Sequence, residues 1–213
     1  MACNMGDGVL RGNGLTQTGQ TFVLRGLKRF AFQAFKLKTG FGHDKDVRNL
    51  QAMREVLGPD AVLTCDSNQN LDLPSAVAFA QAIAPLNLSW FEEPLRVDAP
   101  EADWQALARA SSTPLAGGEN FHGLQFDQAL ASPVLQVIQP DITKWGGISG
   151  NASVARSAVA AGKRYCPHYF GGGVSLLASL QVLAAVGGDI GWRYPRPYPK
   201  DCVRAQQHPC LSI

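Results

Sequence analysis

A repeat of strand-like and helix-like segments constrains this sequence more than any other feature. Short apolar segments of strand character recur along the chain, and each is followed by a longer segment with the apolar periodicity of a helix. The strand segments centre on Lys36, Thr64, Phe91, Ala116, Ile138 and Tyr165, which lie 28, 27, 25, 22 and 27 residues apart. A βα repeat of about 25 residues predicts parallel strands that are joined by helical crossovers.

Six such repeats in 213 residues favour an α/β fold of the (β/α)₈ TIM-barrel type over a doubly wound sheet. No Gly-x-Gly-x-x-Gly motif follows the first clear strand, which argues against the nucleotide-binding alternative. We expect the barrel domain to cover residues 31–192, between an atypical N-terminal segment at 1–30 and an atypical tail at 193–213. The helical patterns cover residues 44–57, 73–84, 101–110, 123–130, 149–161 and 174–186.

The composition excludes several classes of protein. The net charge is only +2 and the basic residues are not clustered, so neither nucleic acid nor a membrane surface is expected as a partner. No apolar stretch has the length of a membrane span, and the first residues lack a signal-peptide pattern. The five cysteines form no Cys-x-x-Cys pair, which argues against a disulfide scaffold or zinc ribbon. A cytoplasmic location is expected.

Acidic residues follow three successive strand segments, at Asp66, Glu92 and Glu119. The carboxyl ends of parallel barrel strands meet at one face, where barrel enzymes carry out their chemistry. Three carboxylates held together repel one another unless a cation lies between them, and their hard oxygens suit Mg²⁺. Each acid alone would instead fit a helix cap. Asn68, two positions after the first acid, is a candidate substrate ligand, whereas Glu93 must point away from Glu92.

Basic residues occupy the corresponding ends of other strands. Lys36 and Lys38 alternate along one strand, and a neighbouring divalent cation would lower the pKa of Lys38 enough for it to act as a base. His168 follows a later strand, and Asp141 on the preceding strand could orient its ring. Solvated strand ends and a structural histidine are the alternatives for these residues. The role of Lys144 stays open.

At these residues the chain resembles the mandelate racemase and muconate-lactonising branch of the enolase superfamily. The resemblance covers residues 32–192. Phe35-Lys36-Leu37-Lys38-Thr39-Gly40 is similar to the Lys-x-Lys strand of that family, in which the second lysine is the base. Asp66, the first glutamate of Trp90-Phe91-Glu92-Glu93-Pro94, and Glu119 resemble its three ligands for Mg²⁺, the cofactor that the resemblance implies.

Gln139-Pro140-Asp141 and Cys166-Pro167-His168 resemble the Asp–His dyad of the racemase subgroup. The lactonising subgroup carries a lysine there, so the dyad favours the racemase and acid-sugar dehydratase side. The resemblance implies an enzyme that abstracts the proton α to a carboxylate, most simply a sugar-acid dehydratase, a lyase. Either Lys38 or the His168–Asp141 dyad would take the α-proton, and His168 would protonate the departing 3-hydroxyl. A 2-hydroxy-acid racemase or epimerase of the same family is the alternative. The implied partner is a small carboxylate substrate, and a homo-oligomer is compatible with the sequence.

The sequence departs from this family at both ends. Family members carry an N-terminal α+β capping domain, which residues 1–30 are too few to build. The last family strand usually has a glutamate, whereas Arg193 and Tyr194 follow Gly191-Trp192 here. We therefore expect an incomplete barrel without the capping domain, and a catalytically inactive truncated remnant is a third interpretation.

Overall fold

The computed structural model describes residues 2–5, 34–169 and 172–186. Its strands are β1 (Ala2–Met5), β2 (Ala34–Lys38), β3 (Val62–Asp66), β4 (Phe91–Glu92), β5 (Leu115–Gly117), β6 (Val137–Ile138) and β7 (Arg164–Tyr165). Its helices are α2 (His43–Leu57), α3 (Leu73–Ile83), the short 3₁₀ helix η1 (Ala84–Leu86), α4 (Glu101–Ala110), α5 (Leu124–Ala131), α6 (Gly147–Ala160) and α7 (Gly173–Val186). The expected domain boundaries near residues 30 and 192 lie outside the described residues.

The strands are hydrogen-bonded to one another in chain order, from β1 to β7. The pairings from β1 to β5 are all parallel. A doubly wound sheet would reverse its strand order at a switch point, whereas the strands of a barrel follow one another in sequence. The predicted α/β class with the strand succession of a (β/α)₈ barrel is therefore confirmed.

The expected helices are all present within one or two residues of their predicted ends. The strands are shorter than their apolar segments, and β1 was not expected because residues 1–20 show no periodicity. Asp44 and Asp46 lie in the first turn of α2, and Gly42, which has no side chain, occupies the N-cap position. The carboxylate of Asp46 instead accepts the backbone N–H groups of Gly40 and Phe41, so it fixes the loop that leaves β2.

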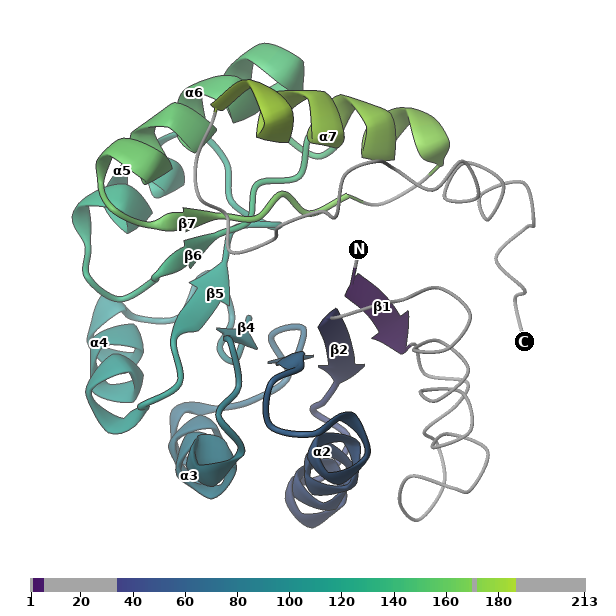
Figure 1. Cartoon of the computed structure of the whole chain (residues 1–213). Helices are drawn as coiled ribbons and strands as arrows, with labels where there is room; N and C mark the ends of the chain where they lie inside the picture. The colour runs from purple at the N-terminus through teal and green to yellow at the C-terminus, as the bar shows by residue number, and fades with distance from the viewer. Residues whose placement is uncertain (1, 6–33, 170–171, 187–213) are drawn as a thin grey trace. The chain divides into compact units, whose positions relative to one another are not determined.

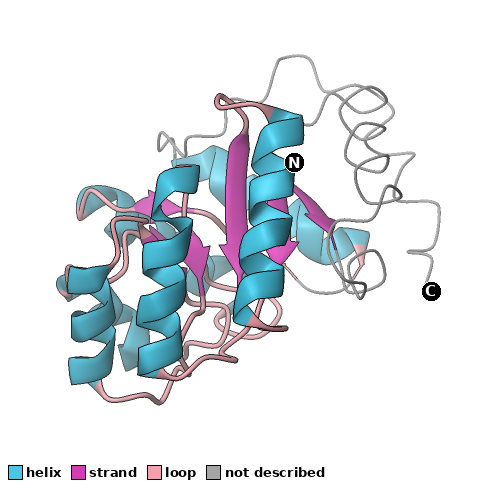
Figure 2. Ribbon diagram, turned by 90° about the horizontal axis from the view of Figure 1, so that it is seen from below, coloured by secondary structure: helices cyan, strands magenta, loops and turns pink. Residues whose placement is uncertain are grey.

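The chain divides into two compact units. The first unit comprises residues 1–117 and 132–137, and the second comprises residues 118–131 and 138–213. In the first unit, α2, α3 and α4 lie side by side outside the strands (Figures 1 and 2). The buried face of α3 includes Phe79, whose ring packs against Phe91 of β4 with the centroids 5.4 Å apart.

In the second unit, α6 packs beside α5 and α7. The buried face of α6 carries Val154, Ala155 and Ala158, at the spacing of one helical stripe. Phe126 of α5 packs against Trp145, with ring centroids 5.0 Å apart. Among the described helices of both units, none is long and apolar enough to cross a membrane.

Arg54 of α2 ties together the segments that lead into β3 and β4. Its guanidinium donates hydrogen bonds of 2.8–3.1 Å to the backbone carbonyls of Gly58, Ala61, Leu86 and Asn87. The planar fork of arginine suits several acceptors at once, which the single ammonium of lysine cannot reproduce. Arg54 therefore fixes the start of the two strands whose far ends carry Asp66 and Glu92.

Replacing Arg54 with methionine should lower the free energy of unfolding by about 2 kcal/mol or more, because several backbone carbonyls lose a charged donor. Chemical denaturation followed by circular dichroism measures the change. Arg48→Met is the matched control, since Arg48 lies exposed on the same helix. Equal stability of the two variants would contradict the role of Arg54.

Candidate active site

Three charged side chains of the first unit form a row across adjacent strands. Lys38 is in register with Asp66, and Asp66 is in register with Glu92. Neighbouring strands lie about 4.8 Å apart and side chains alternate between the faces, so these three must share one face. The intervening residues Leu37, Cys65 and Phe91 are fully buried on the other face.

Two lysines neutralise the carboxylates in this row. The Nζ atom of Lys36 lies 2.6 Å from Oε1 of Glu92 and 3.1 Å from Oδ2 of Asp66. The Nζ atom of Lys38 lies 2.5 Å from Oδ2 of Asp66 and donates to Oδ1 of Asn68 at 2.7 Å. Five of the expected site residues are thus gathered in one network, namely Lys36, Lys38, Asp66, Asn68 and Glu92.

The ion pairs in this network shift the pKa values of its members. Burial alone would raise the pKa of Asp66, but the charges of Lys36 and Lys38 outweigh it and lower that pKa to about 2. Burial likewise disfavours the charged form of Lys36, yet Glu92 and Asp66 raise its pKa above the ordinary value. Lys36 therefore stays a cation and Asp66 stays an anion at neutral pH.

The backbone just beyond β3 and β4 is held in an unusual conformation. Asn68, Gln69 and Glu93 have positive φ angles of 43°, 63° and 39°. Such angles in residues other than glycine cost of order 1 kcal/mol each and persist only where the surroundings enforce them. Here the backbone N–H of Gln69 donates to the carbonyl of Glu93 at 2.8 Å, and Ser67 donates to Glu92 at 3.0 Å. The strand ends are therefore locked together.

The third acid, Glu119, lies two residues beyond the end of β5 rather than within a strand. Ala116 occupies the position in register with Glu92, so Glu119 follows its strand, as expected, but from the loop rather than from the last strand residue. Gly118 stands between β5 and Glu119: its φ is +129°, and a Cβ there would lie 3.0 Å from the backbone nitrogen of Gln139. A residue with a side chain would be strained at this position.

In the second unit, Glu119 contacts the histidine and a lysine. The Nε2 atom of His168 lies 3.0 Å from Oε2 of Glu119, and Nζ of Lys144 lies 3.0 Å from Oε1. The Nδ1 atom of His168 lies 2.6 Å from Oδ2 of Asp141. Thr143 holds the other oxygen of Asp141 through its backbone N–H and its hydroxyl. The structure thus brings the expected Asp–His pair together.

Electrostatics favour the ionised forms of both acids in this group. Burial opposes ionisation of Glu119, but His168 and Lys144 outweigh it and lower the pKa of Glu119 to about 2. Burial also opposes ionisation of Asp141, and the hydrogen bonds from Thr143 and His168 lower its pKa nevertheless. Both carboxylates are therefore negative at neutral pH and available to hold a proton donor or a cation.

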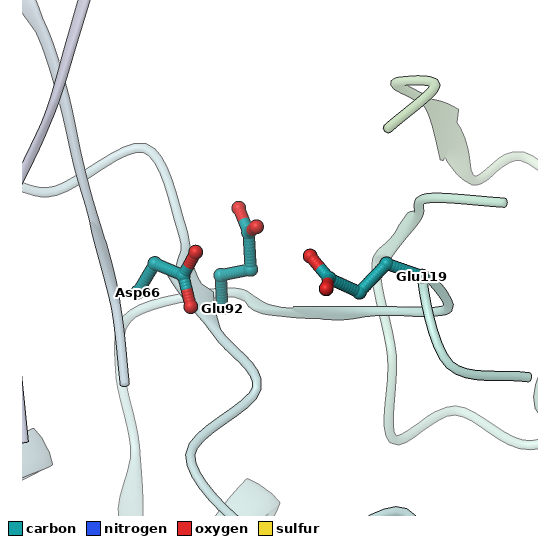
Figure 3. A group of neighbouring side chains, drawn as sticks. All are labelled: Asp66, Glu92 and Glu119. Carbon is teal, nitrogen blue, oxygen red and sulfur yellow. The ribbon is translucent and has the colours of Figure 1, made fainter. Parts of the chain in front are cut away.

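Asp66, Glu92 and Glu119 are the buried carboxylates suited to holding a metal ion within the part of the chain that is described (Figure 3). Their oxygens fit the preference of Mg²⁺ for hard anionic ligands. Two contacts of these carboxylates were not foreseen, namely Lys144 with Glu119 and Trp90 with Glu92. The contact of Trp90 could have been predicted from the sequence, because Trp90 stands two positions before Glu92 and side chains two positions apart in a strand share a face.

The chain is similar to known proteins in its sequence and in its fold. A family model described as enolase C-terminal domain-like matches residues 20–203. The chain is 38% identical over 160 residues to the D-galactarolactone cycloisomerase of Agrobacterium fabrum, covering 74% of this chain and 42% of that protein. It is 29% identical over 160 residues to the arabinonate dehydratase of Saccharolobus solfataricus, covering 74% and 43%.

A solved structure from Bordetella bronchiseptica, described as a mandelate racemase/muconate lactonizing enzyme, is 49% identical to the chain. It superposes with a TM-score of 0.76 and covers 83% of this chain and 49% of that one. The chain thus spans less than half the length of the relatives that it matches.

Acid should destabilise the metal-free protein through Asp66 and Glu119. Their pKa values of about 2 lie below the values near 4 of an unfolded chain. The stability that they contribute is therefore complete above about pH 5 and is lost as the pH falls towards 2. Denaturant unfolding at a series of pH values should show this loss, and Glu119→Gln should reduce it by on the order of 2 kcal/mol.

Asp127→Asn provides the control for this experiment, since Asp127 is exposed on α5 of the same unit. Its acid profile should follow that of the parent. A Glu119→Gln profile that also follows the parent would show that the pKa of Glu119 is not depressed.

Proposed function

The chain belongs to the enolase superfamily, in its mandelate racemase and muconate-lactonising branch, and from this membership we propose that it abstracts the proton α to a carboxylate with the help of Mg²⁺. The reaction that we propose is dehydration of a sugar acid. Among the relatives, an arabinonate dehydratase bears a name of this class. The contact between His168 and Asp141 carries the proposal, because it supplies an oriented proton donor.

The proposed Mg²⁺ ligands are Asp66, Glu92 and Glu119. All three are buried, and each is already engaged by a cationic group or a histidine. The three carboxylates carry negative charge on hard oxygen atoms. A divalent cation such as Mg²⁺ compensates such charge and prefers such ligands. When bound, Mg²⁺ would act as a Lewis acid that stabilises negative charge on the substrate carboxylate.

Lys38 is the proposed base. Its neighbour Lys36 has a raised pKa and contacts two carboxylates, so Lys36 serves as a fixed positive charge rather than as a proton acceptor. Lys38 is held by Asp66 and by the amide oxygen of Asn68. Asn68 in turn would donate its amide N–H to a hydroxyl of the substrate, which makes it the proposed substrate-binding residue.

His168 is the proposed acid. Its Nδ1 is engaged by Asp141, which fixes the ring, and its Nε2, which contacts Glu119, is the nitrogen that we propose exchanges the proton. In the proposed dehydration the C2–H bond breaks towards Lys38 and its electrons form the C2–C3 double bond. The C3–O bond breaks as Nε2 of His168 protonates the departing hydroxyl, so that water leaves. The resulting enol then becomes a 2-keto acid.

Racemisation of a 2-hydroxy acid is the second candidate. A racemase needs two groups that exchange a proton with the same carbon, and Lys38 and His168 are the two that we propose. This candidate is supported by the solved structure that is 49% identical to the chain, which is described as a mandelate racemase/muconate lactonizing enzyme. Racemisation inverts C2 without loss of water, so the products distinguish the two reactions.

Magnesium should raise the thermal stability of the protein by mass action and bind measurably in a calorimeter. Glu119→Gln should weaken binding by at least about tenfold, because one anionic ligand becomes neutral. Glu55→Gln, an exposed position on α2, should bind Mg²⁺ like the parent. Unchanged binding by Glu119→Gln would remove Glu119 from the ligand set.

Sugar acids incubated with the protein and Mg²⁺ in D₂O test the reaction itself. The parent should exchange the α-proton and release a 2-keto acid, both visible by NMR. His168→Asn should lower dehydration by about 100-fold or more while exchange that depends on Lys38 persists. His122→Asn, an exposed histidine of the same unit, is the control.

Recovery of a substrate that is inverted at C2, without formation of a keto acid, would favour the racemase reaction over dehydration. Mg²⁺ binding without exchange on any sugar acid or 2-hydroxy acid would favour an inactive chain.

A further inference from the structure

We infer that Trp90 is a positioning residue, which holds Glu92 ready for a divalent cation through the N–H of its indole ring. The inference rests on the proposed function in one respect, namely that the cation is the proposed Mg²⁺. The observation behind it is a hydrogen bond of 3.0 Å from Nε1 of Trp90 to Oε2 of Glu92, inside the protein.

The geometry fixes the carboxylate of Glu92 at both of its oxygens. Trp90 stands two residues before Glu92, so the two side chains leave the chain on the same side. The Nε1 atom of Trp90 contacts Oε2, while Nζ of Lys36 contacts Oε1 at 2.6 Å. Trp90 is only 3% exposed and Glu92 only 1%, so water does not substitute for either contact. Rotation of the carboxylate group is thereby restricted.

The two donors differ in what they do when a cation arrives. The ammonium of Lys36 carries a positive charge, which repels a divalent cation. The indole N–H is neutral and does not titrate near physiological pH, so it orients Glu92 without such repulsion. Each carboxylate oxygen has two lone-pair directions, and one hydrogen bond leaves room for a metal at the same group. Donors of this kind orient metal ligands and tune their affinity.

Trp104 shows that this contact is not a general property of buried tryptophans in the chain. Trp104 is also buried, but its Nε1 donates to the backbone carbonyl of Arg96 at 3.2 Å. That bond ties α4 to the preceding loop and touches none of the proposed ligands. Trp104→Phe is therefore a matched control, because it removes an indole and a buried N–H donor without touching Glu92.

Calorimetric titration with MgCl₂ compares the parent with Trp90→Phe and Trp104→Phe. Phenylalanine keeps an aromatic ring but lacks the N–H, so Trp90→Phe should weaken Mg²⁺ binding by about 10-fold or more. Trp104→Phe should bind like the parent even if it is less stable to heat. Equal affinity of Trp90→Phe and the parent would overturn the inference while leaving the proposed function intact. Absence of Mg²⁺ binding by the parent would overturn both.

A spectroscopic measurement on the parent keeps the inference testable if Trp90→Phe does not fold. The chain has four tryptophans, and single Phe variants of Trp104, Trp145 and Trp192 identify three of the four indole N–H resonances in a ¹⁵N-tryptophan sample. The remaining resonance belongs to Trp90. It should shift on saturation with MgCl₂, because its acceptor binds the ion. An unmoved Trp90 resonance at saturation would show that the indole does not act on the metal ligand.

Discussion

Compensation of buried negative charge is the constraint on which this protein depends. Asp66 and Glu92 are almost completely buried, and an isolated carboxylate in such a place would be protonated rather than charged. Lys36 and Lys38 reach them from β2 and keep Asp66 ionised. In the second unit, His168 and Lys144 do the same for Glu119. The charged side chains therefore persist only as sets, and each set forms at strand ends.

The backbone around these charged sets is held in a restricted conformation. Positive φ angles at Asn68 and Glu93 and the close approach at Gly118 are conformations that an unconstrained loop would leave. Hydrogen bonds between the loops after β3 and β4 hold them. Arg54 acts at the opposite ends of the same strands. Fixed side-chain positions are what proton transfer and metal binding require, because a small displacement weakens either one.

The sequence was sufficient for the order of the elements because the βα repeat records a regular backbone pattern. It also pointed to the acids and bases at strand ends, whose chemical roles stay predictions. The sequence was not sufficient to predict features that depend on contacts between residues far apart in the chain. β1 lacks any periodic signal and is defined by pairing with β2. The need for glycine at position 118, just before Glu119, arises from the close approach of the backbone of Gln139. The partner of Lys144 lies 25 residues away in sequence, on the loop after another strand.

Side chains alternate between the two faces of each strand, so apolar packing and charged chemistry lie on opposite faces of the same strands. Phe91 packs against α3, and Leu37 and Cys65 are buried on the same side, so this face carries the apolar packing of the strands. Lys38, Asp66 and Glu92 occupy the other face. A substitution on the second face leaves the apolar contacts of the first unchanged. A lineage with this architecture can therefore alter its chemistry through matched changes within a charged set while the apolar packing stays as it is, which is a route to evolvability.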